Sequence, residues 1–101
     1  MILKFHKKKF FQIFFHKNKG NLYIKLDGDF DGSSAHELLN TLKEKGPGFY
    51  HIHIDTNDLK KIYPFGRDVF EKNFKILRKQ LNNIIFAGEN KQHLAPNLTQ
   101  R

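Results

Sequence analysis

The sequence predicts one α/β domain, built on a mixed sheet of about four strands with its helices on one face. Several short segments alternate apolar and polar residues as strands do, and two longer segments repeat apolar residues at helical spacing. Their order along the chain is β-β-α-β-α-β. Strand–helix–strand units close with right-handed crossovers, so we expect the last three strands to be parallel neighbours with both helices on the same face. The 101 residues are enough for a single core.

The first two strands are predicted to form a β-hairpin. Residues 10–16, FFQIFFH, are rich in β-forming aromatic side chains, and residues 17–21, KNKGN, contain the Asn and Gly of a tight turn. Residues 22–28, LYIKLDG, then alternate, and the apolar side chains that share one face are Leu22, Ile24 and Leu26. Residues 29–33, DFDGS, are expected to form a loop that leads into the first helix.

The first helix has marked ends. Ser34 and Glu37 have the spacing of a capping box, in which each side chain bonds the other residue's backbone N–H. Residues 46–48, Gly-Pro-Gly, end the helix because glycine accepts the left-handed C-terminal conformation and proline cannot continue a helix. Between these ends one face is apolar, formed by Ala35, Leu38, Leu39 and Leu42.

The second half of the chain repeats this plan, beginning with an alternating strand at residues 49–55, FYHIHID. The side chains that should share one face of this strand are Tyr50, Ile52 and Ile54. Those that should share the opposite face are His51, His53 and Asp55. A loop should follow, and then a second helix over residues 67–80 whose inner face is formed by Val69, Phe70, Phe74, Leu77 and Leu81. Residues 82–88 predict a short buried strand, and a brief helical turn after Glu89 should fray at Pro96. The predicted core contains Leu26, Leu39, Ile54, Phe74 and Ile85.

Positive charge is concentrated near the N-terminus. The net charge is +8, and residues 1–20 contribute +6 because they contain six Lys and no acid. Residues 1–9 are therefore expected to form a basic arm whose patch consists of Lys4, Lys7, Lys8 and Lys9. Such an arm can attract nucleic acid or anionic lipid through phosphate contacts. It can also simply protect an exposed edge strand from pairing with other molecules, which is the interpretation that we favour.

The composition limits the chemistry that this chain can perform. It contains no Cys, which excludes disulfides, thiolate metal sites and Cys nucleophiles and fits a reducing cytoplasm. No apolar run is long enough to span a membrane. No order of Ser, His and Asp, Gly-rich phosphate loop or pair of acids in an apolar pocket stands out. We therefore expect a cytoplasmic protein that is not an enzyme and has no cofactor.

Two groups of residues bear on whether the chain could bind a metal. The spacing of His51, His53 and Asp55 lets two imidazoles approach one metal, but a third well-placed ligand is not evident. A calcium loop would need more oxygen ligands than the alternating acids of the first turn supply, Asp27, Asp29 and Asp31. We therefore expect no metal site.

Three segments carry a resemblance to a known family. The strand LYIKLDGDFD at 22–31 precedes the helical segment SSAHELLNTL at 33–42. The segment IHIDTNDLKKIYPFG at 52–66 reads as a buried strand that ends in Asp55, followed by a loop that closes at Gly66, eleven residues later. In this joint order and spacing the segments resemble a STAS domain, the module of anti-sigma factor antagonists and of sulfate-transporter tails. The resemblance implies a STAS-like mixed sheet with helices on one face.

The resemblance extends over about residues 10–94, but the chain departs from it where the family's regulatory chemistry lies. A STAS regulatory loop typically places an Asp and then a phosphorylatable Ser or Thr just before the Gly, whereas this chain has Tyr63 and Pro64 there. Proline has no hydroxyl, so Pro64 is a phosphoacceptor-equivalent position that cannot accept phosphate. The loop is still expected to connect strand to helix, with Gly66 relieving strain before the helix.

The same loop predicts a surface for binding a partner protein, formed by Tyr63, Pro64, Phe65, Gly66 and Arg67. Tyr and Arg are frequent interface anchors, although Phe65 could instead tuck under the second helix. A further interpretation is an anion site, in which backbone N–H groups at the helix start act together with Arg67 and Lys60 or Lys61. Asp68 argues against that site, because an acid in the first turn would already satisfy the helix dipole.

Two functions follow from these observations. The first, which we favour, is a STAS-like protein-interaction module in a cytosolic regulatory system. Its partner would be another regulatory protein, kinase-like or anti-sigma-like by resemblance. The second is binding of nucleic acid or an anionic surface through the basic arm and the Phe-rich hairpin, with Phe10, Phe14 and Tyr23 available for base stacking. The expected organisation is the arm at 1–9, one domain at 10–95 and a frayed C-terminus at 96–101.

Overall fold

The computed structural model describes residues 10–94, and in this part of the chain the elements follow the predicted order. The strands are β1 (Gln12–Asn18), β2 (Asn21–Phe30), β3 (His51–Ile62) and β4 (Asn83–Ala87). The helices are α1 (Gly32–Lys45), α2 (Pro64–Leu77) and the short α3 (Lys91–Leu94), with a single 3₁₀ turn, η1 (Arg78–Gln80), after α2. Within residues 10–94, no helix is long and apolar enough to cross a membrane.

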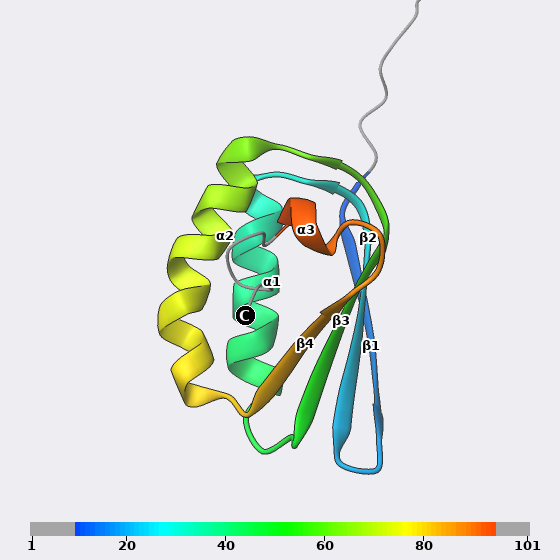
Figure 1. Ribbon diagram of the computed structural model, residues 1–101, viewed down its shortest axis with the longest axis vertical. Helices are drawn as coiled ribbons and strands as arrows, with labels where there is room; N and C mark the ends of the chain where they lie inside the picture. The colour runs from blue at the N-terminus through cyan, green and yellow to red at the C-terminus, as the bar shows by residue number, and fades with distance from the viewer. Residues whose placement is uncertain (1–9, 95–101) are drawn as a thin grey trace, which may run out of the picture.

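The sheet has the strand order β1-β2-β3-β4. β1 is antiparallel to β2, and β2, β3 and β4 are parallel neighbours, as the sequence predicted. Figure 1 shows α1 and α2 side by side on one face of this sheet. The hairpin turns at Lys19 and Gly20, whose φ angles are 51° and 81°. Two positive φ values in a two-residue loop are the requirement of the turns that match the right-handed twist of paired strands.

The core lies between the sheet and the two long helices. The strands contribute buried Leu22, Ile24, Leu26, Ile52 and Ile54, and the helices contribute Ala35, Leu38, Leu39, Leu42, Phe70, Phe74 and Leu77. Aromatic rings fill much of the space: Phe70 packs edge-on against Phe30 and stacks on Phe74, and Phe74 packs edge-on against Phe86. Four of the five predicted core residues are confirmed: Leu26, Leu39, Ile54 and Phe74.

For two residues the predicted orientation of the side chain toward the core was wrong. In β4, Ile84 and Phe86 pack against the core, so the period of two places Ile85 between them on the opposite face of the sheet. Tyr50 precedes β3 and lies beside the hairpin turn, where its backbone N–H donates to the Gly20 carbonyl at 2.9 Å, and its side chain is 71% exposed.

The predicted loop at 29–33 is taken up by the end of β2 and the start of α1, and the loop expected after Asp55 is strand as far as Ile62. β2 continues to Phe30 and β3 continues to Ile62, and the pairing between them shifts register twice. At each shift β3 has one more residue than β2, as in a β-bulge. The bulges interrupt the alternation of buried and exposed positions, which explains why the sequence pattern ended at Asp55 while Thr56 and Leu59 beyond it are buried.

The cap of α1 differs from the prediction. Asp31 is the N-cap residue, and its Oδ1 accepts hydrogen bonds from the Ser34 N–H at 3.0 Å and from the Ser33 and Ser34 hydroxyls at 2.9 Å. Ser34 is therefore inside the helix, 2% exposed, and does not cap it. At the other end Gly46 keeps a right-handed conformation, and the positive φ belongs to Gly48.

α2 begins at Pro64, three residues before its predicted start, because proline suits the first turn of a helix where its missing N–H has no partner to lose. Gly66 lies within this turn. A Cβ at Gly66 would come within 2.6 Å of the backbone carbonyl carbon and oxygen of Asp31, so the two helix starts meet backbone to backbone. Gly66 is therefore required by close packing, and the expectation that it relieves strain before the helix was wrong.

The buried face of α1 gives a first prediction. We expect Leu39→Ala to lower the free energy of unfolding by about 2–5 kcal/mol, because it leaves a cavity where α1 packs against α2. Ile85→Ala is the matched control, since Ile85 lies on the face of the sheet opposite to α1 and α2, and its loss should be smaller. Chemical denaturation of both variants measures the difference. Equal losses would contradict the arrangement of the core.

The helix contact gives a second prediction. Gly→Ala inside a helix usually stabilises by roughly 0.5–1 kcal/mol, but Gly66→Ala should instead destabilise by about 1–3 kcal/mol, because the new methyl meets rigid backbone. In the control, Gly32→Ala, the methyl meets only the Phe65 ring at 3.0 Å, and that exposed ring is free to move aside. Thermal melts should therefore rank Gly66→Ala well below Gly32→Ala, and the reverse ranking would show that the helix starts can separate.

Candidate interaction surface

The residues predicted as a partner-binding loop form the N-cap and first turn of α2. The Tyr63 N–H donates to the Phe30 carbonyl at 2.9 Å, and the Arg67 N–H donates to the Tyr63 carbonyl at 3.0 Å. Gly66 is buried against Asp31. This turn is therefore held by the end of β2 on one side and by the start of α1 on the other.

Phe65 points out of the fold. Its side chain is 72% exposed, and its ring lies over Gly32 at the start of α1. The alternative in which it tucks under α2 is therefore wrong. Tyr63 is half-buried, and the Lys61 ammonium lies 5.0 Å from the centre of its ring, a cation–π contact that orients both side chains. We refer to Tyr63, Pro64, Phe65, Gly66 and Arg67 as the α2 turn.

Charge at the α2 turn is positive or neutral. Because the helix starts at Pro64, its first turn contains no acid, and Asp68 lies beyond it. The expectation that Asp68 satisfies the helix dipole in the first turn was therefore wrong. Arg67 Nε lies 3.5 Å from the Asp68 carboxylate, but both side chains are partly exposed, so this ion pair contributes little to stability.

A second feature adjoins the α2 turn. A cavity of about 300 Å³ is lined by Lys60, Ile62, Arg67, Asn90 and His93, and we refer to it as the basic pocket. Sequence reasoning missed Asn90 and His93, because they follow β4 and approach Lys60 only through the parallel pairing of β3 and β4. The signal present in the sequence was the polar run ENKQH directly after that strand.

The other face of the sheet carries a row of aromatic side chains. His16 stacks on Tyr23 with ring centres 5.0 Å apart, and Tyr23 stacks on His53 at 4.7 Å. Both flat sides of the Tyr23 ring are therefore covered by neighbouring rings. Phe14, 50% exposed, remains available beside this row, whereas Phe10, 82% exposed, precedes β1.

Polar residues on this face have structural roles. The Asp55 carboxylate accepts a hydrogen bond from the Asn57 N–H at 2.9 Å, and His51 Nδ1 lies 3.1 Å from the Asn83 amide. Across residues 10–94, no three side chains of His, Cys, Asp or Glu gather as metal ligands. The hydrogen bond and charge of Asp58, 3.0 Å from the Lys25 ammonium, raise the pKa of Lys25.

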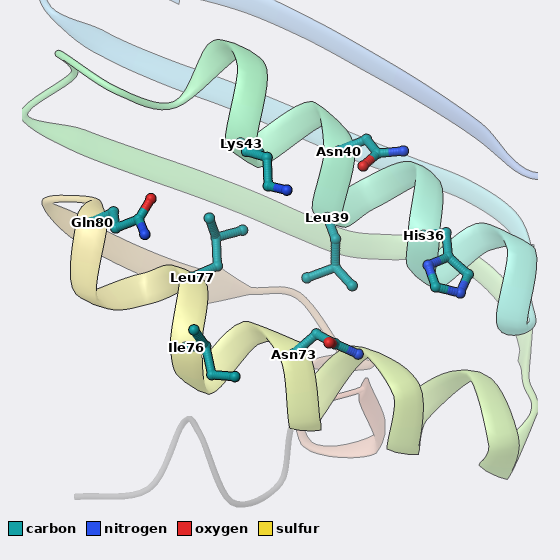
Figure 2. Close-up of a pocket in the computed structure, with 8 residues that line it drawn as sticks. All are labelled: His36, Leu39, Asn40, Lys43, Asn73, Ile76, Leu77 and Gln80. Atoms are coloured by element: carbon teal, nitrogen blue, oxygen red, sulfur yellow. The ribbon is translucent and has the colours of Figure 1, made fainter.

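A shallow groove separates the outer sides of α1 and α2, shown in Figure 2. Its volume is about 330 Å³, and its lining is mixed: His36, Leu39, Asn40, Lys43, Asn73, Ile76, Leu77 and Gln80. Ile76 is 66% exposed at its rim, but no set of charges converges here. The predicted basic patch, Lys4, Lys7, Lys8 and Lys9, lies outside the described residues.

Comparison with known proteins addresses the fold. No family model and no curated protein sequence matches this chain. The solved structures that share its fold include the following two. The crystal structure of Mglu has a TM-score of 0.67 and 14% identity over 77% of this chain, which spans only 20% of that protein. An anti-sigma factor antagonist from Mycobacterium paratuberculosis has a TM-score of 0.58 and 10% identity over 82% of this chain and 73% of that protein. At such identities the likeness shows the fold alone, and the chain has a STAS-like fold.

Proposed function

We propose that this chain is a non-catalytic protein-interaction module in a cytosolic regulatory system and that it docks its partner through the α2 turn. The observation that carries the proposal is the 72% exposure of Phe65 on a turn whose backbone is fixed. Exposing a large apolar ring to water is unfavourable, so covering the ring with a partner lowers the free energy of the complex. The expected partner is another regulatory protein, in keeping with the STAS-like fold.

The backbone of the α2 turn favours docking because it is ordered before a partner arrives. The Tyr63–Phe30 hydrogen bond, Pro64 and the close approach of Gly66 to Asp31 together restrict its conformation. A preorganised turn loses little further entropy on binding, so more of the contact energy appears as affinity. Tyr63 and Arg67 flank Phe65 with side chains of the types that most often dominate interface energetics.

The proposed docking involves no chemical step. The residue that stands where related regulatory loops carry a hydroxyl is Pro64, which has none. Phosphorylation at this position therefore cannot switch the surface off, and we expect the α2 turn to stay in one conformation. Control of the interaction would then reside in the partner or in its abundance.

The second candidate, binding of nucleic acid or an anionic surface, draws on the net charge of +8. It has less support from the sheet, because the Tyr23 ring is covered on both sides by His16 and His53 and cannot receive a base. Phe14 is the ring on this face that stays open for stacking. We therefore favour docking at the α2 turn.

Paired substitution tests the proposed surface. Tyr63→Ala with Phe65→Ala should weaken capture of native partners from cell extract at least tenfold, because it removes both rings. Tyr50→Ala with Phe10→Ala removes one Tyr and one Phe of 71% and 82% exposure elsewhere and should leave capture unchanged. Quantitative mass spectrometry of the captured proteins measures both effects. The control pair should barely move the melting temperature, because exposed side chains contribute little to folding, and the half-buried Tyr63 ring should add only a small loss to the first pair.

Equal capture by the two pairs would remove the α2 turn as the docking site. If the Tyr63 pair instead lowers the melting temperature strongly, Phe65→Ala alone decides, since that ring is mostly exposed. Unchanged capture by this single variant would count against the proposal just as clearly.

Deletion of residues 1–9 separates the two candidate functions. If the segment only protects an edge strand, the shortened protein should keep its melting temperature and aggregate more readily. Its binding to single-stranded DNA, measured by fluorescence anisotropy over a range of salt concentrations, should equal that of the full chain. Tight binding that falls steeply with salt and disappears on deletion would favour the nucleic-acid function.

A further inference from the structure

We infer that the basic pocket binds a phosphoryl group and that, during docking, this group belongs to a phosphorylated side chain of the partner. The anion site stands on the pocket alone, whereas its assignment to a partner rests on the proposed function. Such a site would make docking at the α2 turn depend on whether the partner is phosphorylated.

Three side chains that can donate to an anion converge from three separate elements. Lys60 comes from β3, Arg67 from the first part of α2 and His93 from α3, and all three line the same cavity of about 300 Å³. Among residues 10–94 the remaining lining residues are Ile62 and Asn90, so no carboxylate from the described part of the chain faces the cavity. A pocket lined by cationic and neutral groups alone is electrostatically prepared for an anion.

The α3 wall of this pocket is anchored. The Asn90 side-chain amide donates to the Thr56 carbonyl at 2.9 Å and to the Leu59 carbonyl at 3.2 Å, and the Asn90 N–H donates to Thr56 Oγ1 at 3.2 Å. Leu94, at the end of α3, is fully buried. These contacts attach α3 to the bulged part of β3, so His93 has a defined place opposite Lys60.

The cations of the pocket are only lightly engaged with acids. Within residues 10–94, no ion pair joins Lys60 to a carboxylate. Arg67 touches Asp68 through Nε at 3.5 Å, which leaves its two terminal amino groups for another partner. Glu71, one turn further along α2, does not line the pocket.

The number and spread of these donors favour a phosphoryl group over a carboxylate. One Arg satisfies a carboxylate through two parallel hydrogen bonds, so a second and third donor from other directions would be superfluous. A tetrahedral dianion presents three oxygens in different directions and uses Lys, Arg and an imidazole N–H together. The cavity volume lies at the lower end of the range for ligand sites, which suits one such group.

The position of the pocket connects it to docking. Arg67 belongs to both the pocket and the α2 turn, so the pocket adjoins the proposed docking surface. Pro64 cannot carry phosphate itself. Position 64 is therefore ruled out as the source of a phosphoryl group, and the two sources that the test distinguishes are the partner and a free ion.

Titration of the full-length chain with two probes tests this inference. The probes are inorganic phosphate and N-acetylphosphoserine N-methylamide, added at constant ionic strength and followed by ¹H–¹⁵N NMR. We expect saturable shifts at the amides of Lys60, Arg67 and His93. Lys60→Gln with His93→Asn should weaken phosphoserine binding at least tenfold. The control, Lys72→Gln with His36→Asn, removes the same residue types outside the pocket and should bind like wild type.

The outcomes separate this inference from the proposed function, because the pocket variants keep Tyr63 and Phe65 intact. Tighter binding of the phosphoserine probe than of phosphate supports a phosphorylated partner. Equal or tighter binding of inorganic phosphate overturns the partner assignment and leaves a site for the free ion. No saturation by either probe, or the same affinity in both variants, overturns the anion site itself. Failure of the α2 turn to capture a partner would leave these titrations unchanged.

Discussion

The structure depends most on the contact between the starts of its two long helices. The parallel pairing of β2 and β3 brings Phe30 next to Ile62, so that α1 and α2 begin side by side at the same edge of the sheet. Gly66 then meets the backbone of Asp31, the residue that also caps α1. With any larger residue at position 66 the helices would have to separate, and the aromatic packing of Phe30, Phe70 and Phe74 beneath them would loosen.

A second constraint lies in the irregular half of β3. Thr56 is fully buried, and its hydroxyl donates to the Ala87 carbonyl at 2.8 Å and accepts from the Asn90 N–H. A buried hydroxyl is stable only when it is hydrogen-bonded, so the end of β4 and the start of α3 are tied to the bulge. Bulges are common beside functional sites because they redirect side chains. Here the redirected stretch of β3 supplies Lys60 and Ile62 to the basic pocket.

These two constraints determine which side chains the proposed docking surface presents. The same packing that fixes the backbone of the α2 turn leaves the Phe65 ring outside, and the same bulge that anchors α3 places His93 near Arg67. An apolar contact at Phe65 would supply affinity, and an anion in the pocket would supply selectivity, because unpaired charges are costly to bury. The recognition that we propose therefore requires no chemical step in this chain.

The sequence by itself determined the order of elements, the hairpin, the apolar faces of β2, α1 and α2, and most of the core, because these depend on local periodicity and turn residues. The tertiary structure decided the features that depend on contacts between distant residues, which the periodicity of the sequence does not reveal. The bulges break the alternation of apolar and polar residues in the second half of β3, so the sequence pattern did not reveal that half as strand. The N-cap of α1 is Asp31 and not the predicted Ser34. In β4, Ile84 and Phe86 face the core, so Ile85 between them faces the other side of the sheet. The α2 turn was recognisable from Pro64 and Gly66, but the exposure of Phe65 followed from Gly66 packing on Asp31. Lys60 and His93 became neighbours only because β3 and β4 pair in parallel, which brings residues far apart in sequence to one edge of the sheet.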